Sequence, residues 1–348
     1  MGLGISNHLR FLSFHIEQGR PRGVGRYPED RTLEDADQHD LGFRLRDETY
    51  AAQIGVRNGR LGRSGETMGS LEARSPPTWF LLANRLPYGR WKALDFFRKL
   101  KLLDDRIVAV PFYDRLINLP LNLVNEDLRQ YQRGRISMFS SFCARHLGRF
   151  DFIDCGAHLG MFSAQFTVLS DRVQKLIAVE PNPLLFSLLH HNLQKVAATQ
   201  IQCVNAALSD FEGRGRLVEA EYDRGMDAMY LVADPDGDIQ VTTLAAVLRN
   251  RTQPRVAIKL DVEGQEVPVL RGAADAIRSL DRVALFVELH KDVLARTGMS
   301  DIEMLSQINA IRPFTWFNSG TGNTVDAGHG VLQELNQKQC DLIGISET

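Results

Sequence analysis

One stretch of the chain, residues 150–180, constrains the fold more than any other. Its first six residues, FDFIDC at 150–155, are mostly apolar and run into a glycine, which is typical of a strand buried on both faces of a sheet. A helical pattern follows at 161–168, and then a second apolar run at 175–179 that ends at Glu180. The order of strand, glycine turn, helix, strand and acid predicts one half of a nucleotide-binding α/β fold.

The residues at the two strand ends suit a nucleoside ligand. Gly156 and Gly160 frame the turn, where the absence of side chains lets backbone N–H groups approach a ligand closely. Glu180 ends the second strand, and one carboxylate can accept hydrogen bonds from both hydroxyls of a ribose. We therefore predict that this turn and this acid bind the nucleoside.

The residue that precedes the turn distinguishes between nucleotide ligands. A dinucleotide-binding turn reads G-x-G-x-x-G and faces a pyrophosphate, but here Asp154 stands at the place of the first glycine. A carboxylate repels a pyrophosphate and favours a cation. S-adenosylmethionine (SAM) carries a sulfonium and an ammonium and no phosphate, so the charge argument favours a methyltransferase over a dehydrogenase. A purely structural turn in another α/β protein is the alternative.

A second stretch, RVAIKLDVEGQEVPVLRGA at 255–273, resembles the FkbM family of SAM-dependent methyltransferases. The hallmark of that family is a strand ending in I-K-x-D-x-E-G-x-E, followed by a helix and L-x-G-A. The residues that match it are Ile258, Lys259, Asp261, Glu263, Gly264, Glu266, Leu270, Gly272 and Ala273. The turn at 154–160 resembles the family's D-x-G-A-x-x-G, and VEPNP at 179–183 resembles its second-strand signature.

The resemblance covers the chain from about residue 149 to its end and carries expectations for fold and function. It implies an α/β, Rossmann-like class I methyltransferase, with a seven-stranded, mostly parallel sheet and helices on both faces. It also implies O-methylation of a hydroxyl on a sugar, a glycolipid or a polyketide-like natural product. A methyltransferase-like binding module without activity is one alternative. A nucleotide-dependent oxidoreductase is another, although its G-x-G-x-x-G is missing.

The predicted cofactor residues follow the ends of the predicted strands. Asn205 and Ala206 end a third strand at 201–206, where this fold usually holds the adenine; a turn role is the alternative for Asn205. Asp261 ends a fourth strand at 255–261, at the sheet edge where open α/β sheets place ligands, and is expected near the methionyl group. The full predicted set for SAM is Asp154, Gly156, Ala157, Gly160, Glu180, Asn182, Asn205, Ala206 and Asp261.

A hydroxyl acceptor must lose a proton, and three residues are candidates to receive it. His290 follows a fifth strand at 283–289 and can titrate near neutral pH. Glu263 and Asp261 are the other two, although acids at a helix N-terminus also stabilise the helix dipole. A capping role is the alternative for His290, and Lys259 is expected to pair with one of the acids. No metal site is predicted.

Bulk properties limit the function classes. The chain has 348 residues, a formal net charge of −2 and four cysteines without a C-x-x-C pair. No global basic field favours nucleic acid, and no apolar run is long enough for a transmembrane helix. We expect a cytoplasmic protein with reduced thiols and a hydroxyl-bearing small-molecule or glycan acceptor.

The N-terminal part is expected to differ from the catalytic domain at 149–348. Residues 1–75 have low apolar density and are predicted to be a disordered tail. Residues 76–148 are predicted to be an extension with a strand pair at 107–112 and 115–121 and a helical region at 125–147. The aromatic and basic stretch 79–103 either packs on the catalytic domain or contacts a membrane surface, as a peripheral protein would.

Overall fold

The computed structural model describes residues 73–75, 106–113, 115–121, 132–194, 196, 200–219, 229–335 and 337–347 of the chain. The predictions for a disordered tail and for the stretch 79–103 lie outside these ranges, apart from residues 73–75, and stay predictions. Within the described ranges, no helix has the length and apolar character that crossing a bilayer requires.

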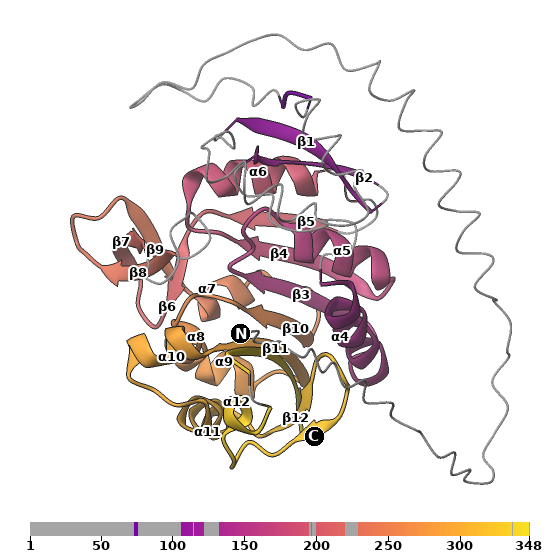
Figure 1. Cartoon of the computed structure of the whole chain (residues 1–348), viewed down its shortest axis with the longest axis vertical. Helices are drawn as coiled ribbons and strands as arrows, with labels where there is room; N and C mark the ends of the chain where they lie inside the picture. The colour runs from indigo at the N-terminus through magenta and orange to yellow at the C-terminus, as the bar shows by residue number, and fades with distance from the viewer. Residues whose placement is uncertain are drawn as a thin grey trace, which may run out of the picture. The chain divides into compact units, whose positions relative to one another are not determined.

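An eight-stranded sheet forms the centre of the fold, in the order β13-β12-β14-β11-β10-β3-β4-β5 (Figure 1). Neighbouring strands from β11 to β5 are parallel, whereas β14 is antiparallel to both β11 and β12. The strands are β3 (Phe150–Cys155), β4 (Val173–Val179), β5 (Gln200–Val204), β10 (Arg255–Leu260), β11 (Arg282–His290), β12 (Phe314–Asn318), β13 (Thr324–Val325) and β14 (Gln339–Ser346).

The strand order is that of a Rossmann-like sheet. The chain starts at β3 in the middle, moves outward through β4 to β5, and then crosses back to β10 and β11 on the other side of β3. The order therefore reverses between β3 and β10, which is the switch point where open α/β sheets bind ligands. The prediction of seven strands is wrong by one, because the two-residue β13 pairs with β12 and is too short to show a sequence period.

Helices cover both faces of this sheet, as predicted (Figure 1). On one face lie α4 (Arg133–His146), α5 (Met161–Leu169) and α6 (Pro183–Leu193). On the other face lie α7 (Leu244–Leu248), α8 (Glu266–Arg271), α9 (Ala274–Arg278), α10 (Lys291–Thr297), α11 (Asp301–Ile311) and α12 (Val331–Glu334). All six residues of β3 are buried, because both faces of this central strand are covered.

Phenylalanines fill the core between the sheet and the first group of helices. Phe139 of α4 packs on Phe166 of α5 with ring centroids 5.2 Å apart, and on Phe286 of β11 at 5.3 Å. Phe162 of α5 lies 5.0 Å from the same Phe286. Such tilted ring pairs bury a large apolar area and fix the helices on the sheet.

The predicted strand pair before the catalytic domain is confirmed as the hairpin of β1 (Ile107–Phe112) and β2 (Arg115–Pro120). Asn192 of α6 fastens it to the domain. The Asn192 side chain accepts from the N–H of Asn118 at 2.8 Å and donates to the carbonyl oxygens of Asn118 and Leu159, both at 3.0 Å. The hairpin, α4 and the sheet therefore share one apolar core. The helix predicted at 125–147 is described from Arg133 onward, and residues 122–131 lie outside the described ranges.

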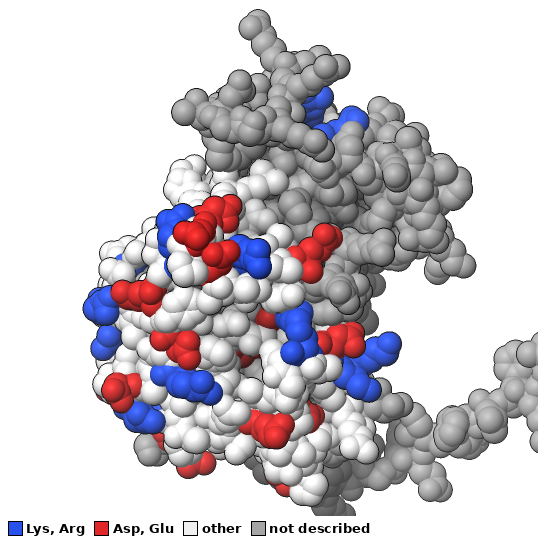
Figure 2. Space-filling view, turned by 90° about the vertical axis from the view of Figure 1, so that its left-hand side faces the viewer, with Lys and Arg blue, Asp and Glu red and all other residues white. Residues whose placement is uncertain are grey.

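A second, four-stranded sheet lies beside the main one in the order β6-β9-β7-β8. Two of its strands are β7 (Gly213–Glu219) and β9 (Ile239–Thr243). The other two, β6 (Ala207–Ser209) and β8 (Met229–Ala233), were not predicted from the sequence. On the face drawn in Figure 2, the described Lys and Arg side chains are interspersed with Asp and Glu.

Candidate active site

A cavity of about 380 Å³ lies at the carboxyl ends of the central strands, beside the switch point. We call it the edge cavity. Its walls come from the turn after β3, the ends of β4, β10 and β11, the hairpin and the small sheet. The charged residues that line it are Glu180, Lys259, Asp261, Glu263 and Glu288.

Gly156 allows the turn after β3 to touch the end of β10. Its backbone has φ +77°, and a Cβ at this position would lie 1.8 Å from the carbonyl oxygen of Asp261. The N–H groups of Gly156 and Ala157 both donate to the carbonyl oxygen of Val179, at 3.0 and 2.9 Å. Gly156 therefore allows the ends of β3, β4 and β10 to approach one another closely. Ala157 lines the edge cavity with it, whereas Gly160 starts α5 and does not.

Glu180 stands at the end of β4 as predicted and is 5% exposed. One carboxylate oxygen accepts from the N–H of His158 at 2.8 Å and the other from the N–H of Asn182 at 2.9 Å. Burial raises the pKa of Glu180, while His158 and these backbone donors oppose the rise. Each oxygen keeps a second lone pair, so this carboxylate, already held in place, can accept from a further donor in the cavity.

The two predicted asparagines have different positions. Asn182 lines the edge cavity, and its side-chain oxygen caps α6 by accepting from the N–H groups of Leu184 and Leu185. Asn205 is exposed and does not line the cavity. Its side chain donates to the carbonyl oxygens of Glu180 and Pro181 at 2.8 and 3.2 Å, which supports the turn reading for this residue. Ala206 is buried in the cavity wall.

Lys259 connects two of the predicted acids. Its ammonium lies 3.4 Å from Asp154 and 3.0 Å from Asp261, and it donates to the carbonyl oxygen of Gly156 at 3.0 Å. Its expected pairing with an acid is therefore confirmed, and with two acids rather than one. Lys259 is 5% exposed, and a buried cation of this kind requires such partners.

Asp154 is fully buried and does not line the edge cavity, contrary to what direct contact with a ligand requires. Besides Lys259, its carboxylate accepts from the hydroxyl of Ser163 at 2.6 Å. Burial raises the pKa of Asp154, and the Lys259 ammonium opposes the rise. The cation that Asp154 faces belongs to the chain itself, and through Lys259 the acid positions Asp261 and the glycine turn.

The acids after β10 divide into a supporting one and two that face the cavity. Glu266 is 6% exposed and accepts from the N–H groups of Val262 and Gly264, both at 3.2 Å, so it holds the turn in shape. Asp261 and Glu263 line the cavity. Glu263 has φ +53°, and Arg296 donates to its carbonyl oxygen at 2.5 Å. This left-handed backbone conformation of Glu263 is held by Arg296. Such strained conformations are concentrated at functional sites.

The opposite wall contains a residue that the sequence analysis did not select. Glu288 of β11 lines the edge cavity, together with Gln339 at the start of β14, and the Gln339 amide donates to the Glu288 carboxylate. Asp341 lies beside Glu288 on β14 and pairs with Arg135 of α4 at 2.7 Å. The only sequence signal for Glu288 was an acid at the end of an otherwise apolar strand.

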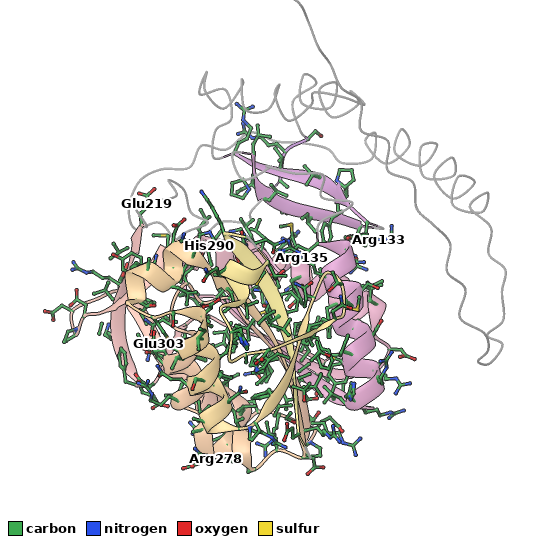
Figure 3. The ribbon with its side chains drawn as sticks, turned by 60° about the horizontal axis from the view of Figure 1, so that its bottom comes forward. Arg133, Arg135, Glu219, Arg278, His290 and Glu303 are labelled. Carbon is green, nitrogen blue, oxygen red and sulfur yellow. The ribbon has the colours of Figure 1, made fainter. Side chains whose placement is uncertain are left out.

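His290 is the last residue of β11, one position beyond the predicted end of that strand, and it does not line the edge cavity. In Figure 3, His290 and Arg135 lie toward one end of the domain and Arg278 lies at the other. His290 is thus at the correct edge of the sheet but outside the cavity wall that Glu288 and Asp261 form. In the described part of the chain, no three His, Cys, Asp or Glu side chains are grouped as a metal site requires.

The sheet and its switch point define a Rossmann-like α/β domain with an acid-lined cavity at the ligand-binding edge of such sheets. Residues 154–312 match the family model described as "Methyltransferase FkbM domain". Over these residues, the predicted resemblance to the FkbM methyltransferase family is confirmed. The match begins at Asp154 and covers the cavity walls up to β11, but it ends before β14.

No curated protein matches the sequence. Among solved structures, the precorrin-6y C5,15-methyltransferase of Geobacter metallireducens GS-15 is 15% identical, with 65% of this chain and 90% of that chain covered and a TM-score of 0.31. M. jannaschii TYW2, solved with AdoMet, is 12% identical, with 70% and 87% covered and a TM-score of 0.37. A SAM-dependent methyltransferase from Aquifex aeolicus is 6% identical, with 62% and 92% covered and a TM-score of 0.36. Such low scores add nothing to the fold assignment, which rests on the strand order.

Proposed function

We propose that the chain is a SAM-dependent methyltransferase that transfers a methyl group to a hydroxyl of a sugar, a glycolipid or a polyketide-like natural product. The observation that carries the proposal is Glu180, a buried carboxylate at the end of the second strand of the fold, held by two backbone N–H groups and facing the edge cavity. An acid at this position suits the two hydroxyls of a ribose. The FkbM domain match supplies the reaction class.

Under this proposal, the order of the strands sets the direction in which the cofactor lies along the sheet edge. With Glu180 on the ribose, the adenine lies toward Ala206 after β5, and the methionyl group lies toward Asp261 after β10. The strand spacing of about 4.8 Å places β11 about 14 Å from β4 along the edge. The acceptor therefore belongs at the β11 end of the cavity, where Glu288 and Gln339 form the wall.

The residues of the chain fit the charge of this cofactor. Asp261 presents a carboxylate to the cavity, suited to the ammonium of SAM, and Lys259 beneath it holds that carboxylate in place at 3.0 Å. SAM supplies an electrophilic methyl group on its sulfonium. The chain contributes alignment of acceptor and cofactor, exclusion of water and a group that receives the acceptor proton.

A hydroxyl acceptor is supported by the chemistry of the cavity wall. The acids that line it accept hydrogen bonds from hydroxyl groups, and Lys259, the cation in that wall, already faces two carboxylates. A phosphate or carboxylate near the reacting hydroxyl would meet these acids, so we expect a neutral polyhydroxyl group at the reacting end.

Two measurements test the proposal. A thermal shift with S-adenosylhomocysteine (SAH), the demethylated product, should raise the melting temperature of the purified chain, and NAD should not. Transfer of tritium from methyl-labelled SAM into glycan or lipid extracts should then identify the acceptor fraction. A response to NAD without one to SAH would contradict the proposed cofactor, and transfer to nitrogen or carbon alone would contradict the proposed acceptor.

A further inference from the structure

Glu288 occupies the acceptor end of the edge cavity because of two strand pairings. In the parallel pair of β10 and β11, Leu260 stands opposite Val287, so Asp261, just past the end of β10, lies beside Glu288, which is still within β11. In the antiparallel pair of β11 and β14, Glu288 stands opposite Asp341. The Glu288 side chain is half-buried between these two acids and lines the cavity.

The acids of the edge cavity differ in the groups that hold their carboxylates. Glu180 accepts from two backbone N–H groups at the ribose position, Asp261 is 3.0 Å from Lys259, and Glu263 is 3.8 Å from Arg296. Glu288 instead accepts from the neutral amide of Gln339. A carboxylate held by a neutral amide keeps more of its basicity than one held by a cation.

We infer that Glu288 is the residue that receives the proton of the acceptor hydroxyl. The inference rests on the proposed function and assigns a catalytic role that the sequence analysis gave to His290, Glu263 or Asp261. In the step, the acceptor oxygen forms a bond to the methyl carbon while the bond between that carbon and sulfur breaks. The electron pair of the broken bond stays on sulfur, which becomes the neutral thioether of SAH, and the hydroxyl proton moves to the Glu288 carboxylate.

The surroundings of Glu288 suit a proton acceptor. Burial raises its pKa well above the usual value, and the negative charges of Asp261 and Asp341 raise it further. The Lys259 ammonium lowers this pKa and the Glu263 carboxylate raises it, while Arg135 pairs with Asp341 from the α4 side. A carboxylate whose pKa lies closer to neutrality is a better general base at neutral pH. His290 lies two residues farther along β11, outside the cavity wall.

A first test needs no acceptor and uses SAM and SAH as probes. The two ligands differ by one methyl group and one positive charge on sulfur, so only SAM gains affinity when Glu288 ionises. The affinity for SAM relative to SAH should therefore rise with pH, by about tenfold for each unit by which SAM lowers the pKa of Glu288. Glu288→Gln should remove the rise, while Glu303→Gln, a change at an exposed acid on α11, should leave it intact.

A second test measures tritium transfer from labelled SAM into the acceptor fraction. Glu288→Gln should lower the rate by about 100-fold or more while SAH affinity stays within about twofold of wild type, because general-base catalysis contributes that much. Unchanged transfer by Glu288→Gln, or loss of the pH effect in His290→Gln instead, would overturn the inference. A wild-type affinity ratio that does not change with pH would overturn it too. A wild-type chain that binds neither SAM nor SAH would contradict the proposed function itself.

Discussion

The two halves of the sheet edge hold their carboxylates in different ways. On the β3–β4 half, Glu180 accepts from two backbone N–H groups supplied by its own turn and by the turn after β3. On the β10–β11–β14 half, Asp261, Glu288 and Asp341 stand side by side, and side chains hold them, namely Lys259, Gln339 and Arg135. The first half presents one carboxylate fixed by the backbone, whereas the second brings three acids together from neighbouring strands.

This difference shows how separate segments build one cavity. The β3–β4 half is made within about thirty residues, so its geometry follows from a short motif. The other half joins β10, β11 and the distant β14, and Lys259 ties it to β3 through Asp154 at 3.4 Å. Changes at the junction of the two halves should therefore have larger effects than changes within either.

The largest effect is expected at Gly156, where the halves touch. In Gly156→Ala, the new methyl group would lie 1.8 Å from the Asp261 carbonyl oxygen on a backbone with φ +77°. Relief of this overlap must separate β3 from β10, and we expect the free energy of unfolding to fall by about 5 kcal/mol. Urea denaturation measures the loss. The control Gly134→Ala lies in α4 with no atom within 4 Å of the new methyl group and should be neutral or slightly stabilising.

The next largest effect is expected from Lys259→Met. This change leaves the buried Asp154 carboxylate without its cation and should cost about 4 kcal/mol. The double variant Asp154→Asn with Lys259→Met should recover part of the loss, since it removes the uncompensated charge. The surface control Lys175→Met loses one hydrogen bond to the Asn250 carbonyl oxygen and should cost less than about 1 kcal/mol. Equal losses for Lys259→Met and Lys175→Met would show that the pair does not join the halves.

A smaller effect is expected at the hairpin. Asn192→Ala removes three buried hydrogen bonds to Asn118 and Leu159 and should lower the free energy of unfolding by about 2 kcal/mol. Because Leu119 of the hairpin lines the cavity, SAH affinity should fall as well. The control Gln174→Ala removes only one exposed hydrogen bond, to the carbonyl oxygen of Arg172, and should change stability little. Unchanged stability in Asn192→Ala would remove its anchoring role.

The smallest effect is a pH dependence. Burial raises the pKa of Glu266, so its stabilising contribution is present below the pKa of the unfolded chain and is lost as pH rises through the folded pKa. Glu266→Gln removes that loss, and its melting temperature relative to wild type should rise with pH. Glu303→Gln should behave oppositely, because the Ser300 hydrogen bonds lower the pKa of Glu303. Thermal scans of both variants and the wild type from acidic to neutral pH measure the two trends. A pH trend of the same sign in both variants would contradict the opposite pKa shifts of Glu266 and Glu303.

Much of the fold could be predicted from local sequence. Apolar runs that end in glycine or an acid predicted β3, β4, β10 and β11, because parallel strands buried on both faces have such sequences. Glu180 and Asp261 were found as cavity residues for the same reason, since acids that follow buried strands stand at the ligand edge. The short strands β6 and β13 were missed because two or three residues carry no period.

The surroundings of Asp154 and Glu288 could not be predicted from the sequence, because they depend on contacts between distant segments. Asp154 was expected at the ligand because of its place in the motif, but Lys259, more than a hundred residues later, occupies the space before it. Glu288 was overlooked because its setting comes from Asp341 and Gln339, which reach it only through the antiparallel pairing of β14. A sequence motif reports its own strand and turn, and it carries no information on which side chains a neighbouring strand brings.

The most direct measurement is calorimetric titration of SAH into the wild-type chain and into Glu180→Ala. If the carboxylate at the end of β4 holds the ribose, the wild type binds one SAH per chain, and the variant binds about 100-fold more weakly, as the loss of two charge-assisted hydrogen bonds predicts. Its circular dichroism should remain that of the wild type. Equal affinity in both proteins, or no SAH binding by the wild type, would contradict the account.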